Sequence, residues 1–155
     1  MRQKNIPALA MMLFLLMTLI SSQDALSQCK SFVKTSCLPQ LTPYIHDGNY
    51  QAVIMSEGEE AEVYKTVFAG QSYRLFICMD DQIPNVEFVI SDIRRNILFD
   101  NRKNGNVKVW DFKPDASQQI KVTIRIPKIQ KQSASEQELI FGCVGILFSL
   151  LDQYF

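Results

Sequence analysis

The sequence is poor in the residues that most often carry chemistry. Among 155 residues it has one histidine and one tryptophan, and 16 Lys and Arg balance 16 Asp and Glu. A lone histidine, His46, cannot build a histidine metal cluster, and no Gly-x-Ser-x-Gly motif offers it a nucleophile. With its charges balanced, the chain has no excess of basic residues with which to bind nucleic acid or an anionic membrane. We therefore expect His46 to lie in a turn beside Asp47, and we expect no enzyme activity, cofactor or nucleic-acid partner.

No apolar run reaches the roughly 20 residues that span a bilayer as a helix. The run nearest the N-terminus, Ala8 to Ile20, follows Arg2 and Lys4, and small residues stand at the two positions that a signal peptidase reads. This pattern predicts a signal peptide over residues 1–27, a mature chain beginning at Gln28, and no stable membrane insertion after cleavage. We expect the protein in the periplasm, at the cell surface or outside the cell.

All four cysteines follow the predicted cleavage point, which favours a disulfide framework in an exported chain. Three pairings are possible. Short separation favours Cys29 with Cys37, and Cys78 with Cys143 is favoured because each stands in an apolar, strand-like run. Two alternatives remain. A zinc site lacks Cys-x-x-Cys spacing. Acylation of Cys29 as a lipoprotein requires a small residue before it, where Gln28 stands.

The rest of the chain alternates between apolar and polar residues, as strands do. Residues 61–68 and 72–79 predict a hairpin, Asn104-Gly105 predicts the turn of another, and 139–151 predicts a central strand buried on both faces. An irregular lead-in is expected at 29–50, with one helical turn over 30–37, and a loop is expected at 128–138. Further strands are expected at 51–55, 85–91, 97–99, 107–112 and 119–126.

About seven to eight short strands without an amphipathic helix predict an all-β protein. The expected fold is an antiparallel β-sandwich or jelly roll over residues 28–155, with a short irregular N-terminal lead-in.

Three segments carry a family resemblance: EGEEAEVYKTVFAGQSYRLFIC (57–78), VEFVISDIRRNILFDN (86–101) and QQIKVTIRIP (118–127). They resemble bacterial pre-peptidase C-terminal domains, which are small jelly-roll sandwiches. The whole chain resembles small exported proteins of Bacteroidota-type bacteria. The resemblance implies an accessory binding or stabilising module, here without an attached enzyme domain.

Acidic residues are the remaining candidates for chemistry. Asp80 and Asp81 at a strand end are a weak calcium site, and Glu57, Glu59, Glu60 and Glu62 are expected to be solvated. A small hydrolase acting through carboxylates such as Asp80 or Glu57 is the least favoured function. Asp92, Asp100 and Asn101 flank residues 94–96 and are expected to hold a hairpin there through side-chain to backbone bonds.

Aromatic residues are the best candidates for binding, because exposed rings stack on sugars or anchor protein interfaces. Trp110 is a possible ligand residue, although a lone tryptophan in a small sandwich favours the core. Tyr64 and Tyr73 are expected to pair across adjacent strands.

The sequence therefore predicts a non-enzymatic module that binds a protein or glycan of the cell envelope. The alternative is an assembly subunit of an envelope complex, for which the apolar run 139–151 is the support.

Overall fold

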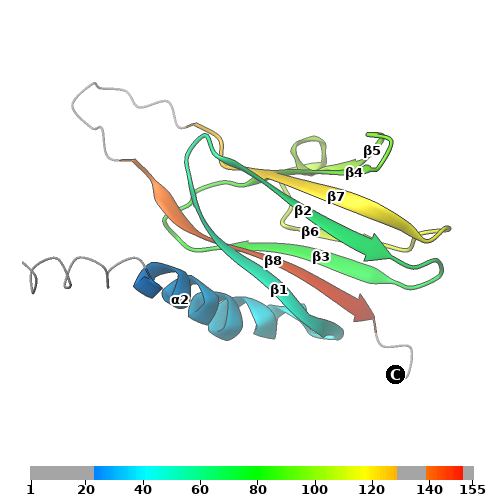
Figure 1. The fold of residues 1–155 in the computed structure, drawn as a ribbon, viewed down its shortest axis with the longest axis horizontal. Helices are drawn as coiled ribbons and strands as arrows, with labels where there is room; N and C mark the ends of the chain where they lie inside the picture. The colour runs from blue at the N-terminus through cyan, green and yellow to red at the C-terminus, as the bar shows by residue number, and fades with distance from the viewer. Residues whose placement is uncertain (1–22, 129–138, 152–155) are drawn as a thin grey trace, which may run out of the picture.

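The computed structural model describes residues 23–128 and 139–151, and it shows eight antiparallel strands in two sheets (Figure 1). Sheet A has the order β1-β8-β3-β6, and sheet B has the order β2-β7-β4-β5. The strands are β1 (Tyr44–Ser56), β2 (Glu60–Val67), β3 (Tyr73–Met79), β4 (Glu87–Asp92), β5 (Ile97–Asp100), β6 (Val109–Phe112), β7 (Gln118–Arg125) and β8 (Phe141–Leu151). The predicted all-β sandwich is confirmed. Residues 1–22 of the predicted signal peptide and 129–138 of the predicted loop lie outside the described residues.

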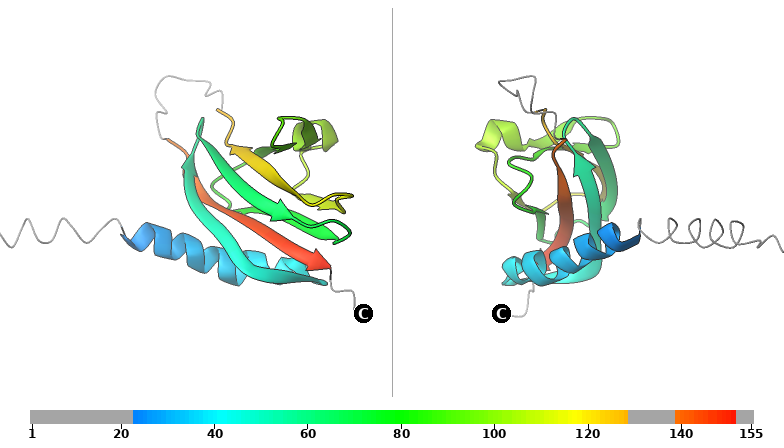
Figure 2. Two further views of the ribbon diagram at one scale, coloured as in Figure 1. Left: turned by 45° about the vertical axis from the view of Figure 1, so that its right-hand side comes forward. Right: turned by 90° about the vertical axis from the view of Figure 1, so that its left-hand side faces the viewer.

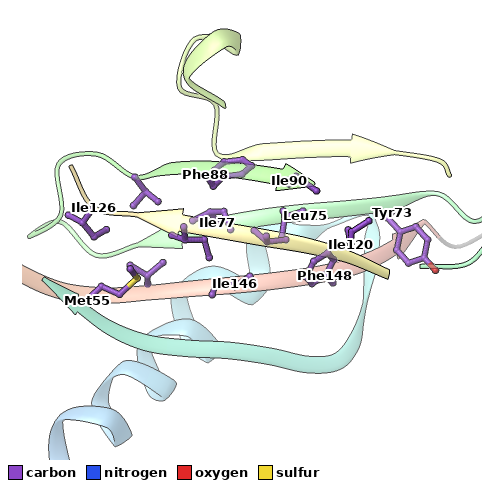
Figure 3. Packing of buried hydrophobic residues seen from close by; sticks show 14 of the residues in the cluster. Met55, Tyr73, Leu75, Ile77, Phe88, Ile90, Ile120, Ile126, Ile146 and Phe148 are labelled. Carbon is purple, nitrogen blue, oxygen red and sulfur yellow. The ribbon is translucent and has the colours of Figure 1, made fainter. Parts of the chain in front are cut away.

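The main core lies between the two sheets, where the inward residues of each strand meet (Figure 3). In β7 the predicted alternation holds, and Ile120, Val122 and Ile124 are at most 1% exposed. Burying each such side chain stabilises the fold by about 1.5–3 kcal/mol. The alternating pattern that predicted the strand therefore also defines the core.

Strand β8 is the central strand that the apolar run predicted. It pairs with β1 on one side and β3 on the other. Val144, Ile146 and Phe148 face sheet B, whereas Leu147 faces the opposite way into a second buried cluster. The apolar residues in the middle of β8 are thus packed inside the domain and only its ends, Phe141 and Leu151, are exposed, which weakens the support for the assembly alternative.

A continuous helical segment covers the outside of sheet A, where the sequence predicted an irregular lead-in (Figure 2). It comprises α2 (Gln23–Phe32), the π-helical turn η1 (Val33–Cys37) and the 3-10 turn η2 (Leu38–Leu41). Its buried stripe repeats every fourth residue, at Cys29, Val33, Cys37 and Leu41. A π-helical turn holds more residues than an α-helical one, so this spacing keeps the stripe facing the sheet. The expectation of no amphipathic helix was wrong.

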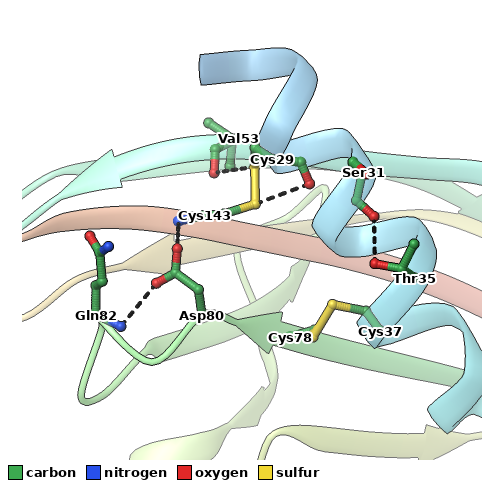
Figure 4. The surroundings of a disulfide bond; sticks show 9 residues. All are labelled: Cys29, Ser31, Thr35, Cys37, Val53, Cys78, Asp80, Gln82 and Cys143. Atoms are coloured by element: carbon green, nitrogen blue, oxygen red, sulfur yellow. Dashed lines mark hydrogen bonds between the residues drawn. A yellow bond between two sulfur atoms is a disulfide. The ribbon is translucent and has the colours of Figure 1, made fainter. Parts of the chain in front are cut away.

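Two disulfides staple this helical segment to sheet A (Figure 4). Cys29 bonds Cys143 of β8, and Cys37 bonds Cys78 of β3, so the favoured pairing was wrong. Cys29 and Cys37 are eight residues apart on one helical stripe, about 12 Å at the helical rise, which is too far for a disulfide. Because the structure bonds all four cysteines in disulfides, the zinc and lipoprotein alternatives are also excluded.

The hairpin predicted around residues 94–96 forms, because β4 pairs with β5, whereas those predicted for 61–79 and at Asn104-Gly105 do not. β2 pairs with β7 in sheet B, whereas β3 pairs with β6 and β8 in sheet A. The turn between β2 and β3 is held by the distant segment 114–117, because Gly70 N–H donates to Pro114 O and Ala69 N–H to Ser117 Oγ. These contacts direct the chain from one sheet to the other.

The segment at Asn104-Gly105 also crosses between sheets. Residues 101–104 form the 3-10 turn η3 (Asn101–Asn104), which ends at Gly105 with a φ of 72°. Asn101 is buried, and its Oδ1 accepts from Phe88 N–H while its Nδ2 donates to Val86 O. This buried amide fixes the segment against β4, so β5 and β6 do not pair.

Candidate binding surface

Asp80 has a structural role in place of the predicted calcium role. Its Oδ2 accepts from Cys143 N–H at 2.7 Å, and its Oδ1 accepts from Gln82 N–H at 3.1 Å (Figure 4). Asp81 is exposed beside it. Within residues 23–128 and 139–151, no three His, Cys, Asp or Glu side chains come together as a metal site. The two aspartates therefore stand in the turn that follows β3, and Asp80 fixes this turn to β8.

His46 lies within strand β1, just before an irregularity in its pairing with β8, and not in an isolated turn. Its Nδ1 accepts from Gly48 N–H at 3.1 Å, and its ring lies 5.8 Å from the Tyr50 ring. The register aligns His46 with Ser149, which aligns with Arg74. The histidine is therefore part of a polar row across one end of sheet A.

Arg74 is the centre of that polar row, and its contacts hold strands together. Its Nε and Nη2 donate to the two carboxylate oxygens of Asp111, each at 2.7 Å, and the hydrogen bond raises the pKa of Arg74. Its guanidinium also lies 4.1 Å from the centre of the Tyr44 ring. Such a bidentate, stacked arginine is engaged by its own protein. We assign this row to stabilisation.

The acids around the β1–β2 turn are likewise engaged with their own neighbours. Glu59 Oε2 accepts from Ser56 N–H at 2.7 Å. Glu62 Oε1 accepts from Lys121 Nζ at 2.6 Å, and this bond lowers the pKa of Glu62. Glu57 N–H donates to Ile140 O, tying the turn to the start of β8.

Trp110 belongs to an aromatic stack that closes the β5–β6 side of the sandwich. Its ring centre lies 3.9 Å from that of Phe112 and 5.4 Å from that of Phe99, and both pairs are stacked. Phe112 stacks in turn on Tyr73. Ring surface that a sugar would need is therefore in contact with protein rings, and Trp110 is a partly buried residue packed against the main core.

Tyr64 and Tyr73 do not pair, because they stand in different sheets. Tyr73 is 4% exposed, and its hydroxyl donates to Gln71 and accepts from Phe68 N–H. Tyr64 is 57% exposed and donates to Glu62. Of the three aromatic candidates, only Tyr64 is largely exposed to solvent.

Tyr64 stands on the outer face of sheet B, which we call the open face. In the part of the chain that the structure describes, no element covers this face, and outward residues of β2 are exposed. The register places Tyr64, Lys121, Ser91 and Ile97 in one row across the four strands. Ile97 is 60% exposed. The row thus has an exposed aromatic side chain beside a lysine at one edge of the sheet and an exposed aliphatic side chain at the other.

The turn between β4 and β5, residues 93–96, continues the open face. Ile93 is 72% exposed, and Arg94 and Arg95 beside it are also exposed. The pKa of Lys121 is raised mainly by its hydrogen bond to Glu62, and the charge of Arg95 lowers it to a smaller extent. The open face therefore ends in an exposed apolar and cationic turn.

Asp92 holds this turn rigidly, as the sequence predicted. Its Oδ1 accepts from the N–H groups of Arg94 and Asn96, each at 2.8 Å, and its Oδ2 accepts from Asn96 Nδ2 at 2.7 Å. These bonds, led by the Asn96 side chain, lower the pKa of Asp92. Asp100 acts similarly at η3, where Arg102 lowers its pKa.

Sequence reasoning treated residues 92–96 only as a turn and missed its exposed side chains. The available signal was the pair of isoleucines, Ile93 and Ile97, that flank two arginines at a strand end. A turn of this kind requires polar or glycine residues and gains nothing from exposed branched aliphatics. The turn is therefore a candidate contact surface.

Apart from the open face, a hollow lies beside the Cys29–Cys143 disulfide. It is lined mainly by apolar side chains, among them Phe32, Ile54 and Phe141, and its one acid is Asp80. Both oxygens of Asp80 accept backbone hydrogen bonds, as described above. The hollow therefore offers less specific chemistry than the open face.

Comparison with known proteins gives no family. No family model and no curated protein matches the chain. Among solved structures, the chain is similar to PliG of Aeromonas hydrophila, described as a periplasmic lysozyme inhibitor of g-type lysozyme. The identity is 13%, the TM-score is 0.43, and the match covers 64% of this chain and 84% of that chain. A likeness at this level gives no information about what this chain binds, and the pre-peptidase C-terminal resemblance stays a prediction.

Proposed function

We propose that this chain is an exported, non-enzymatic binding protein that recognises a macromolecular partner through the open face of sheet B. The observation that carries the proposal is the exposure of Tyr64, Ile93 and Ile97 on one uncovered face. Interfaces are enriched in aromatic residues and arginine, which contribute most of the binding energy. The open face joins both to exposed aliphatic side chains.

The polar groups elsewhere support binding rather than catalysis. Asp80, Asp92 and Asn101 accept backbone hydrogen bonds, and Arg74 is held by Asp111. A catalytic acid or nucleophile needs a side chain in reach of a substrate. These groups are instead engaged in holding turns and strands.

Two disulfides support export, because they persist in oxidising compartments. The predicted cleavage after Ser27 falls within α2. The side chains of residues 25–27 are exposed, and Cys29 is the first buried residue of the described chain. Loss of residues 1–27 would therefore remove no buried side chain from positions 25–27. No described helix is long and apolar enough to cross a membrane.

The test is an affinity capture from cell-envelope extract. The chain is expressed with all its residues, and the exported protein is immobilised as the bait. Three proteins are compared: the wild type, a Tyr64→Ala/Ile97→Ser variant, and an Ile45→Ser control. Ile45 is 53% exposed on β1 of sheet A, so the control removes exposed apolar surface outside the open face.

We expect a protein or glycan that the wild type and the control retain and the open-face variant loses. Equal retention by all three proteins, or hydrolase activity that is lost with one side chain, would contradict the proposal.

A further inference from the structure

The β4–β5 turn has features of a recognition element in its own right. Resting on the proposed function, we infer that this turn selects the partner, and that the partner is a protein with an acidic patch bordered by apolar surface. Arg94 and Arg95 would meet the acids, and Ile93 and Ile97 would meet the apolar border.

The turn is organised before binding. The Asp92 carboxylate accepts three hydrogen bonds. In the backbone, Asp92 N–H donates to Asn96 O and Arg95 N–H donates to Asp92 O. A loop already held in its bound conformation loses less entropy on association. The arginines are therefore presented on a rigid support.

Arg95 is an unusual choice for its backbone conformation. Its φ is 67°, in the left-handed region where glycine or asparagine is easily accommodated. Folding of the turn does not require an arginine there. A residue held in a less favourable conformation at an exposed tip points to a role in binding.

The charges around the turn favour a compact acidic protein patch over other partners. Glu60 and Glu62 are exposed on β2, at the far side of the same face. A broad anionic surface such as an acidic membrane would meet these acids as well as the arginines. A glycan would favour planar rings, whereas Ile93 and Ile97 are branched aliphatics.

The test again measures capture from envelope extract, now with charge variants. Arg94→Glu/Arg95→Glu reverses the turn, and Lys108→Glu/Lys113→Glu is the matched control at exposed cations near β6. We expect reversal to lower retention by about 30-fold or more, because interfacial charge pairs contribute strongly to affinity. The control is expected to retain the partner, and high salt is expected to weaken wild-type retention.

A third variant separates binding from folding. Arg95→Gly suits the left-handed conformation, so its melting temperature is expected to be no lower than that of the wild type. Its retention of the partner is expected to fall nevertheless. Unchanged retention in Arg95→Gly and in the charge-reversed variant would overturn the inference.

The outcomes distinguish the two proposals. If Tyr64→Ala/Ile97→Ser loses the partner while charge reversal does not, the open face binds and the inference about its turn is wrong. If neither variant matters, both are wrong. Vesicles containing phosphatidylserine and the polysaccharide alginate serve as probes of the other classes. Arginine-dependent binding to either, without a retained protein, would also overturn the inference.

Discussion

The two sheets of the sandwich differ in how their outer faces are covered. Sheet A has a buried cluster on its outer face as well as on its inner one, because the helical segment from Cys29 to Leu41 packs on its outside and two disulfides hold it there. Sheet B is buried on its inner face alone. Its outer face is open and carries Tyr64 and Ile97.

An open, polar outer face is ordinary for an antiparallel sheet. What distinguishes sheet B is the turn at one end of that face, where the exposed Ile93 and Ile97 flank the exposed Arg94 and Arg95. The helical segment provides stability on one side of the molecule, which leaves the other side available for contact. We therefore expect stability and binding to be separable by mutation.

The largest effect on the free energy of unfolding is expected from removing a disulfide. The Cys29–Cys143 bond closes a separation of 114 residues, and the loop-entropy relation gives up to about 5 kcal/mol of unfolding free energy for it. A Cys29→Ala/Cys143→Ala variant, which leaves no unpaired thiol at this site, is therefore expected to unfold at much lower urea concentration. A loss below about 1 kcal/mol would show that the helical segment is held without this bond.

The next effect contrasts the outer faces directly. Leu147 is fully buried on the outer face of sheet A, so Leu147→Ala is expected to cost about 2–5 kcal/mol of unfolding free energy. Tyr64→Ala on the outer face of sheet B is expected to change it by less than about 0.5 kcal/mol. Urea unfolding of both variants measures the difference. Equal costs would mean that the open face is also packed.

A smaller effect is expected where the helical segment touches β8. A Cβ at Gly145 would lie 2.8 Å from Cγ2 of Val33, so Gly145→Ala is expected to cost about 1–3 kcal/mol. Val33→Ala removes the opposing methyl groups. In a double-mutant cycle, the two changes together should therefore cost less than their sum. Additive costs would show that Val33 and Gly145 are not in contact, and would contradict this packing of the helical segment on β8.

The smallest effect is expected from lowering the pH. It should reduce the stability of the fold through carboxyl groups on sheet B. The pKa of Asp92 is lowered in the fold, mainly by Asn96, and that of Glu62 is lowered mainly by Lys121. A carboxyl with a lowered pKa stabilises the fold above its ordinary pKa, and this stability is lost as the pH falls through the lowered value.

The melting temperature should therefore decline between about pH 4 and pH 2. An Asp92→Asn variant should start lower and decline less steeply over the same range. Parallel curves for the two proteins would show that Asp92 does not contribute to the acid response.

The strands were predictable because burial on one face imposes a period of two. Ile120, Val122 and Ile124 carried that pattern, and the unbroken run in β8 correctly indicated burial on both faces. Strand pairing was not predictable, because a turn such as Gly70-Gln71 has the same sequence whether it joins strands of one sheet or of two. The contacts that decide it come from residues 114–117.

The helical segment was missed because two of the four residues in its buried stripe are Cys29 and Cys37. Sequence reasoning assigned these two to each other and so removed the period from view. Their side chains point instead to β8 and β3. The candidate surface was found only in part: Tyr64 was named, whereas Ile93 and Arg95 were treated as turn residues.

The most direct test of the account is site-specific photo-crosslinking in the cell that makes the protein. A photoreactive amino acid replaces Tyr64 on the open face in one variant, and Lys34, exposed on the helical segment, in the other. The account predicts a discrete adduct from position 64 and none from position 34. An adduct from position 34 with none from position 64 would show that the partner binds the covered side, and would contradict it.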